Sequence, residues 1–238
     1  MLSYRHVMMP STIFRGSDMK VLVSLLVLIV VTFVAIRAWR YKTLRPLLPW
    51  KYNFGKRRNT LRATLSLLDE RGARTLVETG VARHGLQGTK GDGASTIVFG
   101  VWAKQHDAHL HSVDVSPEAV SRARQAIDEL GLADNTSIHT SDSVRFLATF
   151  GDEVDFLYLD SYDYDKKNEE TQKLSQQHHL EEFQAIEGKL HQDSVVLIDD
   201  CNLPGGGKGK LVIDYMVSKG WNVYRYEYQA ILLQQAGG

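Results

Sequence analysis

Short apolar runs alternate with segments of helical periodicity from residue 59 to the end of the sequence. A connection between two parallel strands of one sheet is right-handed and usually contains a helix, so this alternation predicts a parallel sheet with helices on both faces. The expected strands are 75–79, 111–115, 137–140, 154–160 and 194–199. The expected helices are 60–71, 94–105, 117–130, 142–150, 178–190 and 210–219.

The last two strand-like runs, 221–228 and 230–234, stand so close together that no helix fits between them. They predict an antiparallel hairpin appended to the parallel sheet. The complete expectation is a Rossmann-like, doubly wound α/β fold with a mostly parallel seven-stranded sheet and a C-terminal antiparallel hairpin. A dinucleotide-binding dehydrogenase would normally continue with a helix and a substrate domain, so the hairpin favours another class.

The N-terminal part differs in kind, because the run from Val21 to Ile36 carries no charge. As a helix it would span about 24 Å, and Lys20 and Arg37 can extend their charges to the two interfaces of a bilayer. We therefore expect an N-terminal tail (1–20), a transmembrane anchor (21–39), a basic juxtamembrane linker (40–58) and a catalytic domain (59–238). A cleaved secretory signal is the alternative, but the run ends in Ile36-Arg37-Ala38-Trp39-Arg40, a poor cleavage site.

Charge decides the expected orientation and excludes one class of partner. Basic residues are more numerous after the apolar run than before it, which predicts a single-pass membrane protein with its catalytic domain on the cytoplasmic side. Lysine plus arginine and aspartate plus glutamate both number 28, so the formal net charge is zero and no nucleic-acid partner is expected. Cys201 is the only cysteine, which excludes an intramolecular disulfide. The oligomeric state is not indicated.

A glycine-rich segment follows the first expected strand, whose residues 75–80 read TLVETG. Glycines let the backbone approach a ligand closely, and the helix that opens at Ala94-Ser95-Thr96 offers free N–H groups at its start. Asp114 ends the next strand, where an acid can accept hydrogen bonds from both ribose hydroxyls of a nucleotide. A plain loop and a helix cap are the structural alternatives for these features.

Three segments, Val77-Glu78-Thr79-Gly80, Gly93-Ala94-Ser95 and Val113-Asp114-Val115-Ser116-Pro117, resemble motifs I and II of the class I S-adenosylmethionine (SAM)-dependent methyltransferases. The resemblance covers about residues 60–235 and implies SAM as the cofactor. It places the methionine moiety near the first strand, the ribose on Asp114 and the adenine beside the residues after the third strand. The implied cofactor-binding residues are Glu78, Gly80, Gly93, Ser95, Asp114, Asp142 and Ser143. The segment 81–92 is longer than the family's compact turn and is expected to act as a lid.

Two further strands end in acids, Asp160 after one and the pair Asp199-Asp200 after the other. If these strands are neighbours, the three carboxylates converge, and they would raise one another's pKa unless a cation lies among them. A set of oxygen ligands alone favours a hard ion, Mg²⁺ first. The pattern resembles the metal-dependent O-methyltransferases of the catechol, caffeoyl-CoA and macrolide-sugar types, which implies Asp160, Asp199 and Asp200 as metal ligands. Simple capping of the following turns is the alternative.

The expected reaction needs a group that accepts a proton from the substrate hydroxyl. Asp163, His178 and His179 are the candidates, although the two histidines begin an expected helix and at least one of them is expected to be a surface residue. The polar stretch 163–177 is predicted to be a loop over the site. In the basic loop 203–210, Lys208 or Lys210 either contacts an anionic substrate group or favours solubility and helix entry.

The sequence thus predicts a SAM-dependent methyltransferase that methylates a hydroxyl of a small-molecule, sugar or membrane-associated, lipid-linked acceptor with the assistance of Mg²⁺. A NAD-dependent oxidoreductase also needs a glycine-rich loop and a ribose-binding acid. A catalytically inactive membrane adaptor with the same fold is the third interpretation, because a fold does not guarantee its chemistry.

Overall fold

The computed structural model describes residues 16–41, 54–88 and 90–234, and the chain divides into two units, Met1–Pro46 and Leu47–Gly238. The described part of the first unit is one helix, α1 (Gly16–Tyr41). Within it, Met19–Ile36 has a mean hydropathy of 2.8 and no buried residue, so among the described residues this helix is long and apolar enough to cross a membrane. The predicted apolar helix is confirmed. Most of the predicted linker, residues 42–53, and most of the tail lie outside the described residues.

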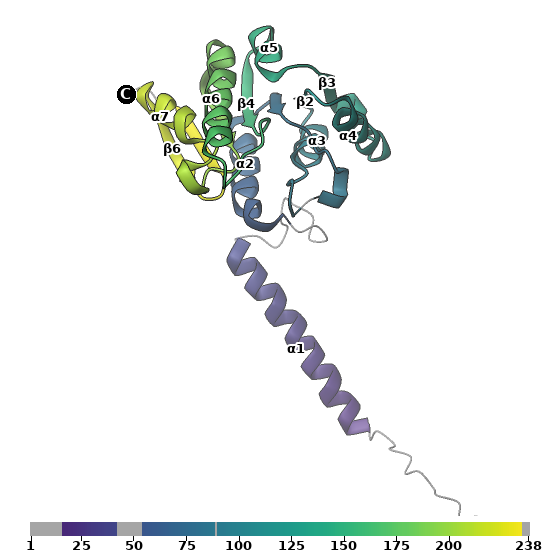
Figure 1. The fold of residues 1–238 in the computed structure, drawn as a ribbon. Coiled ribbons are helices and arrows are strands. Elements are labelled where there is room, and N and C mark those ends of the chain that lie inside the picture. The colour runs from purple at the N-terminus through teal and green to yellow at the C-terminus, as the bar shows by residue number, and fades with distance from the viewer. Residues whose placement is uncertain (1–15, 42–53, 89, 235–238) are drawn as a thin grey trace, which may run out of the picture. The chain divides into compact units, whose positions relative to one another are not determined.

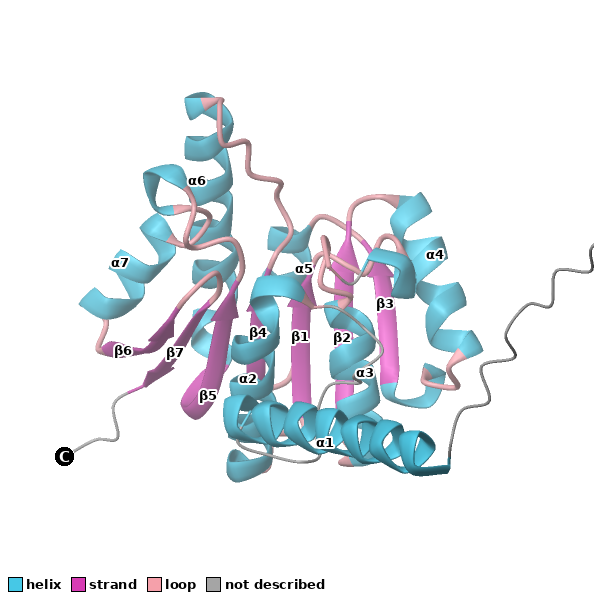
Figure 2. Cartoon of the chain, turned by 90° about the horizontal axis from the view of Figure 1, so that it is seen from below, coloured by secondary structure: helices cyan, strands magenta, loops and turns pink. Residues whose placement is uncertain are grey.

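The second unit (Figure 1) is built on a seven-stranded sheet with the order β3-β2-β1-β4-β5-β7-β6, which can be followed in Figure 2. The strands β1 to β5 run parallel, and β7 pairs antiparallel with both β5 and β6. The predicted fold class, including the C-terminal hairpin, is confirmed. The strands are β1 (Thr75–Thr79), β2 (His109–Asp114), β3 (Thr136–Thr140), β4 (Val154–Leu159), β5 (Leu190–Ile198), β6 (Trp221–Tyr226) and β7 (Ala230–Gln234).

Helices cover both faces of the sheet, as right-handed crossovers require. The helices α2 (Arg58–Arg71) and α3 (Ser95–Gln105) pack on one face, in front of the strands in Figure 2, and α4 (Pro117–Glu129) packs beside α3. The helices α5 (Ser143–Ala148), α6 (Glu169–Ile186) and α7 (Lys210–Ser218) pack on the other face. Short 3₁₀ turns cover Gly55–Arg57, Gly85–Gly88, Ala133–Asn135, Glu187–Lys189 and Pro204–Gly206.

The central strands are buried on both faces, which explains why they read as continuous apolar runs in the sequence. All of Val195–Ile198 in β5 is fully buried, and alternate residues join opposite cores. On the α2–α3 face, Phe99 packs against Phe156 and Tyr158, with ring centroids 4.7 and 5.7 Å apart. Burying each such side chain contributes about 1.5–3 kcal/mol, so the strand ends that carry the site stand on a rigid base.

The predicted start of α6 is wrong, because the helix begins at Glu169 and the polar stretch 163–177 is a loop only in its first part. The Asn168 side chain caps the helix, accepting hydrogen bonds from the backbone N–H groups of Glu170 and Thr171 at 3.0 and 3.1 Å. Acidic side chains in the first turn stabilise such a start. The first turns of α6 are largely exposed, so they lack the apolar periodicity by which the rest of the helix was identified.

The folded unit also includes residues that the sequence assigned to the linker. The Phe54 side chain is buried in the core, and Arg57 is buried as well. Among the described residues, the fold therefore begins at Phe54 rather than at residue 59.

Candidate active site

Gly80, at the end of β1, is the point where three strands come together. Its φ is +83°, and a Cβ added to it would lie 2.7 Å from the carbonyl oxygen of Asp160, so the position requires glycine. Its backbone N–H donates to the carbonyl of Val113 at 2.8 Å. The carboxyl ends of β1, β2 and β4 therefore meet here, as predicted for the cofactor end of the sheet.

Asp114 ends β2 beside Gly80, because the preceding residues of the two strands, Val113 and Thr79, are paired in register. One oxygen of Asp114 accepts a hydrogen bond from the backbone N–H of Ser116 at 2.8 Å. Ser116, rather than Asp114, is the N-cap of α4. A carboxylate has two oxygens, so fixing one of them on the backbone orients the side chain without exhausting its capacity to accept further hydrogen bonds.

The strand β3 ends beside Asp114, because the Ser141 N–H donates to the Asp114 carbonyl at 3.1 Å. The next residue, Asp142, is the N-cap of α5 and accepts from the Arg145 N–H at 2.9 Å. Ser143 is buried, with its hydroxyl 3.0 Å from Nε2 of His178. Both residues lie at the predicted edge of the sheet. There the Asp142 side chain caps α5, and the Ser143 hydroxyl contacts α6 through His178.

Glu78 is fully buried one residue before the end of β1 and does not line the pocket at the strand ends. Its Oε2 accepts a hydrogen bond from the Ser112 hydroxyl at 2.6 Å. Burial raises the pKa of Glu78 to about 7, although the hydrogen bond from Ser112 opposes the rise. The structure therefore places Glu78 behind the cofactor end of the sheet.

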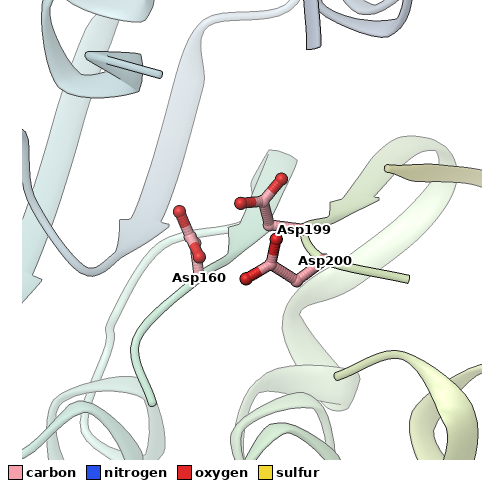
Figure 3. A group of neighbouring side chains, drawn as sticks. All are labelled: Asp160, Asp199 and Asp200. Carbon is pink, nitrogen blue, oxygen red and sulfur yellow. The ribbon is translucent and has the colours of Figure 1, made fainter. Parts of the chain in front are cut away.

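Asp160, Asp199 and Asp200 converge at the ends of β4 and β5, with one carboxylate oxygen of each lying within 4.8 Å of the others (Figure 3). The predicted convergence of these three acids is confirmed. Asp199 is fully buried, while Asp160 and Asp200 are partly exposed. Asp200 has a φ of +50°, an unusual backbone conformation that turns its side chain back toward the other two.

Two buried cations, Arg57 and Lys208, lie within this acid cluster. The Arg57 guanidinium donates to both oxygens of Asp199, through Nε at 2.9 and 3.0 Å and through a terminal nitrogen at 2.5 Å. The Lys208 ammonium donates to Asp160 at 2.6 Å and lies 3.8 Å from Asp200. The sequence placed Arg57 in the linker and left the role of Lys208 open, so Arg57 in particular was missed.

Arg57 also holds the glycine-rich segment against the cluster. It donates to the Gly91 carbonyl at 2.5 Å, and a Cβ added to Gly93 would lie 2.9 Å from its Cδ. Gly93 is thus required where the segment passes the arginine, directly before α3. The guanidinium of Arg57 also stacks over the ring of Tyr228, in the β6–β7 turn, with its central carbon 4.9 Å from the centre of the ring. Tyr228 was not identified from the sequence.

The cations and carboxylates of the cluster stabilise one another in their charged forms. Burial raises the pKa of Asp199, an effect that Asp160 increases and Arg57 opposes. Burial alone would lower the pKa of Lys208, but the nearby carboxylates of Asp160, Asp200 and Asp199 raise it above its ordinary value. Lysine in this setting carries its positive charge at neutral pH.

A pocket of about 180 Å³ opens beside the cluster, between the glycine-rich segment and the loops after β4 and β5. Its walls are mostly charged or polar, which suits a hydrophilic ligand group. The lining residues are Arg57, Gly80, Val81, Arg83, Gly91, Asp92, Ser95, Asp160, Asp163, Asp200, Lys208 and Tyr228. The predicted residues Gly80, Ser95, Asp160, Asp163 and Asp200 thus share one pocket.

Whether the cluster suits a divalent ion depends on its free oxygens. Both oxygens of Asp199 accept from Arg57, and those of Asp160 accept from Lys208 and from the Tyr158 hydroxyl at 3.2 Å. The buried Oδ1 of Asp200 has no hydrogen-bond partner among the residues that the structure describes. Mg²⁺ is usually held by one or two carboxylates and keeps several waters. The oxygens that Arg57, Lys208 and Tyr158 leave open here belong to Asp200, which lies beside both cations, so the present arrangement does not fit the ion.

Asp163 lies at the mouth of the pocket in an ion pair with Arg83. The two oxygens accept from the guanidinium at 3.1 and 3.3 Å, which joins the glycine-rich segment to the loop after β4. Burial alone would raise the pKa of Asp163, but the hydrogen bond and charge of Arg83 hold it below its ordinary value. This pairing makes Asp163 a weak proton acceptor.

The two candidate histidines have different surroundings, and neither lines the pocket. His178 lies 3.3 Å from Glu182; although burial alone would lower its pKa, this acid raises it. His179 is fully buried, with its Nδ1 2.6 Å from the Ser175 carbonyl, and burial lowers its pKa to about 4. The position of His179 does not support a role as base.

Glu182 is a further buried acid that the sequence did not reveal. It accepts hydrogen bonds from the Ser161 hydroxyl at 2.5 Å and from the Thr79 hydroxyl at 3.2 Å. Thr79 precedes Gly80 and Ser161 follows Asp160, so Glu182 links α6 by hydrogen bonds to the ends of β1 and β4. An acid at a buried helix position has no signature in a single sequence, because its partners come from distant segments.

We expect His111 and His179, whose pKa values are lowered chiefly by burial, to destabilise the folded unit as the pH falls from 6.5 toward 4, while Glu78 with its raised pKa contributes in the opposite direction. His111 and His179 both have folded-state pKa values of about 4, below the ordinary 6.5, so in this interval the unfolded chain binds protons that the folded chain does not. Each contributes a slope of up to about 1.4 kcal/mol per pH unit. The free energy of unfolding, measured in urea, should fall less between pH 7 and pH 5 in His111→Gln than in the wild type. An equal change in the two proteins would contradict the lowered pKa of His111.

Comparisons with known proteins agree with this architecture. Residues 89–201 match a family model described as a methyltransferase domain. No curated protein matches the sequence.

Several solved structures share the fold. A Podospora anserina methyltransferase with bound S-adenosylhomocysteine (SAH) is 12% identical, with a TM-score of 0.55 over 75% of this chain and 79% of that one. A putative caffeoyl-CoA O-methyltransferase from Staphylococcus aureus is 14% identical, with a TM-score of 0.55 over 75% and 84%. A Bacillus cereus O-methyltransferase in complex with SAH is 14% identical, with a TM-score of 0.50 over 74% and 80%.

The sheet order and these solved structures give the chain the fold of the class I SAM-dependent methyltransferases, and residues 89–201 match a methyltransferase domain. Within this class the chain resembles the O-methyltransferases, whose solved structures share its fold. The resemblance inferred from the sequence motifs is confirmed.

Proposed function

We propose that this protein transfers the methyl group of SAM to a hydroxyl oxygen of a polar acceptor. The observation that carries the proposal is the adjacency of two features at one edge of the sheet. Gly80 and Asp114 lie side by side at the ends of β1 and β2, where a nucleoside would bind, and the ionic pocket beside Asp160 includes the same glycine. A cofactor at these strand ends would direct its methyl group into that pocket.

The cofactor half of the site has the features that a sulfonium nucleoside needs. Asp114 would accept hydrogen bonds from the ribose hydroxyls, and Gly80 lets the backbone approach the methionine part. Ser95, at the start of α3, lines the pocket where the N–H groups of a helix terminus can meet the amino-acid carboxylate. Asp142 and Ser143 would lie beside the adenine, and the Arg57-bound segment at Gly91–Gly93 would lie above the cofactor end of the pocket.

The transfer itself is a displacement in which the acceptor oxygen attacks the methyl carbon. The new O–C bond forms as the S–C bond breaks, SAH leaves as a neutral thioether, and the hydroxyl proton passes to a base or to solvent. Alignment of the oxygen with the S–CH₃ bond is the main requirement, so the task of the pocket is positioning. The arginine and lysine side chains on its walls would orient and stabilise an oxygen that is losing its proton.

The acceptor is expected to present a polar group, because the pocket walls are charged. A small molecule, a sugar or a headgroup attached to a lipid meets this requirement. The apolar helix α1 favours an acceptor or partner enzyme at the same membrane, with the domain on the cytoplasmic side, where SAM is made. Protection of the domain from added protease in sealed vesicles with the cytoplasmic face inside would test this topology.

Binding of SAH to the full-length chain in detergent, measured by isothermal titration calorimetry, tests the proposal. We expect a micromolar complex in the wild type and binding weakened by about 10- to 150-fold in Asp114→Ala, since hydrogen bonds to a charged group contribute about 1.5–3 kcal/mol. The matched control is Asp134→Ala, an exposed acid in the turn before β3, which should bind like the wild type.

The same experiment separates the alternatives. Absence of SAH binding up to millimolar concentrations would rule out the methyltransferase function. Tight binding of NAD⁺ instead would favour the oxidoreductase, and binding of neither ligand would favour the adaptor.

A further inference from the structure

We propose that the cation of the acid cluster is a lysine of this chain, Lys208, held in place with Arg57, and that the resting site takes no divalent metal ion. This inference corrects the metal site expected from the sequence. It rests on the proposed function only in giving Lys208 a role toward the acceptor oxygen. The metal-binding part stands on the contacts of the cluster alone.

Charge balance is the first argument. The three carboxylates carry three negative charges, and Arg57 and Lys208 contribute two positive charges. The nitrogen–oxygen distances between these cations and the carboxylates are 2.5–3.8 Å. The cluster is therefore nearly neutral as it stands. A divalent ion would have to enter beside two buried cations, which repel it, or displace one of them.

The second argument is that most carboxylate oxygens of the cluster already accept hydrogen bonds. Four of the six carboxylate oxygens, those of Asp160 and Asp199, already accept hydrogen bonds from protein donors. Asp200 offers the remaining two, and they lie 3.6 Å from Arg57 and 3.8 Å from Lys208. A metal ion would have to compete with charge-assisted hydrogen bonds that are already formed within the cluster.

The backbone holds the Lys208 side chain in place, which is the third argument. The Lys208 N–H donates to the Asp200 carbonyl at 3.2 Å, and its side chain is only 3% exposed. The preceding Gly207 has a φ of +63°, and a Cβ added there would lie 1.8 Å from the same carbonyl oxygen. The loop is therefore shaped to bring the lysine over Asp200 and into the cluster.

Lys208 also lines the pocket, and its ammonium has three N–H bonds, one of which donates to Asp160. An acceptor oxygen in the pocket would meet an ammonium at the place where a metal-dependent enzyme would present an ion. Lys208 then acts as a built-in positive charge that stabilises the oxygen as its proton leaves.

The test is titration of the full-length chain in detergent with Mn²⁺, followed by the EPR signal of the free ion. We expect no site in the wild type tighter than about 1 mM, and a site at least about tenfold tighter in Lys208→Met, where the released carboxylates become ligands. Lys208→Arg, which keeps the charge, should behave like the wild type. Lys210→Met is the matched control, because that lysine is exposed and paired with Asp214 outside the cluster.

Either of two results would overturn the inference: micromolar Mn²⁺ binding by the wild type, or no gain in affinity in a folded Lys208→Met. The wild-type titration decides the question even if that variant does not fold. SAH binding measured on the same samples reports the proposed function separately, so a metal site with normal SAH binding would refute only the role of Lys208.

Discussion

Replacement of Arg57 by leucine is expected to lower the free energy of unfolding by about 3–5 kcal/mol, the cost of removing one partner of a buried ion pair. Asp199 is fully buried and takes three of the arginine's hydrogen bonds, so the variant leaves an uncompensated carboxylate beside Asp160. Because Arg57 also donates to Gly91, the glycine-rich segment should loosen and SAH binding should weaken. Urea unfolding and calorimetry on the full-length chain in detergent measure the two effects.

The neighbouring Lys56 is the matched control for this experiment. Its side chain is exposed, with the ammonium 5.2 Å from the centre of the Tyr228 ring, so Lys56→Leu should change the stability by less than about 1 kcal/mol. A double variant, Arg57→Leu with Asp199→Leu, should be more stable than Arg57→Leu alone, since it removes the stranded charge. If Arg57→Leu were as stable as the wild type, the buried pair would not be a part of the native structure.

Substitution of Gly207 by alanine should be similarly damaging, with a loss of about 3 kcal/mol or more. The residue has a left-handed backbone, and the new methyl group would overlap the carbonyl oxygen of Asp200 at 1.8 Å. The backbone would have to shift, carrying Lys208 out of the acid cluster. We therefore expect Gly207→Ala to lower the unfolding midpoint in urea and also to gain affinity for Mn²⁺.

Gly188→Ala provides the comparison, because an added Cβ there meets no atom of the described chain within 4 Å. That variant should have nearly wild-type stability or a slight increase, through the reduced entropy of its unfolded chain. Equal behaviour of the two glycine variants would show that the loop at Gly207 is not constrained as described.

The fold could be predicted because its signals are local. Buried strands such as Val195–Ile198 are apolar throughout, and the single residue between the last two expected runs leaves no room for a crossover helix. The start of α6 was missed because its first turns face solvent and carry charge instead of an apolar stripe. Its signal was the capping residue Asn168, a pattern that also occurs in ordinary turns.

Only the acidic half of the site could be read from the sequence. Asp160 and Asp199 follow apolar strands directly, and parallel topology brings such ends together. The cations have no comparable signature. Lys56, Arg57 and Arg58 form one basic run, and which of them enters the site depends on how the chain approaches the sheet. Lys208 lies in a glycine-rich loop whose path is set by the backbone of Asp200.

The position of Arg57 limits where the chain can be cut. A fragment that begins at α2, or at the predicted boundary of residue 59, would lack two side chains of the folded unit. These are the Arg57 guanidinium that neutralises Asp199 and the Phe54 ring that is buried in the core. Truncated versions made for crystallisation or assay should therefore begin no later than residue 54, because the stretch predicted to be a linker supplies Arg57, which lines the pocket.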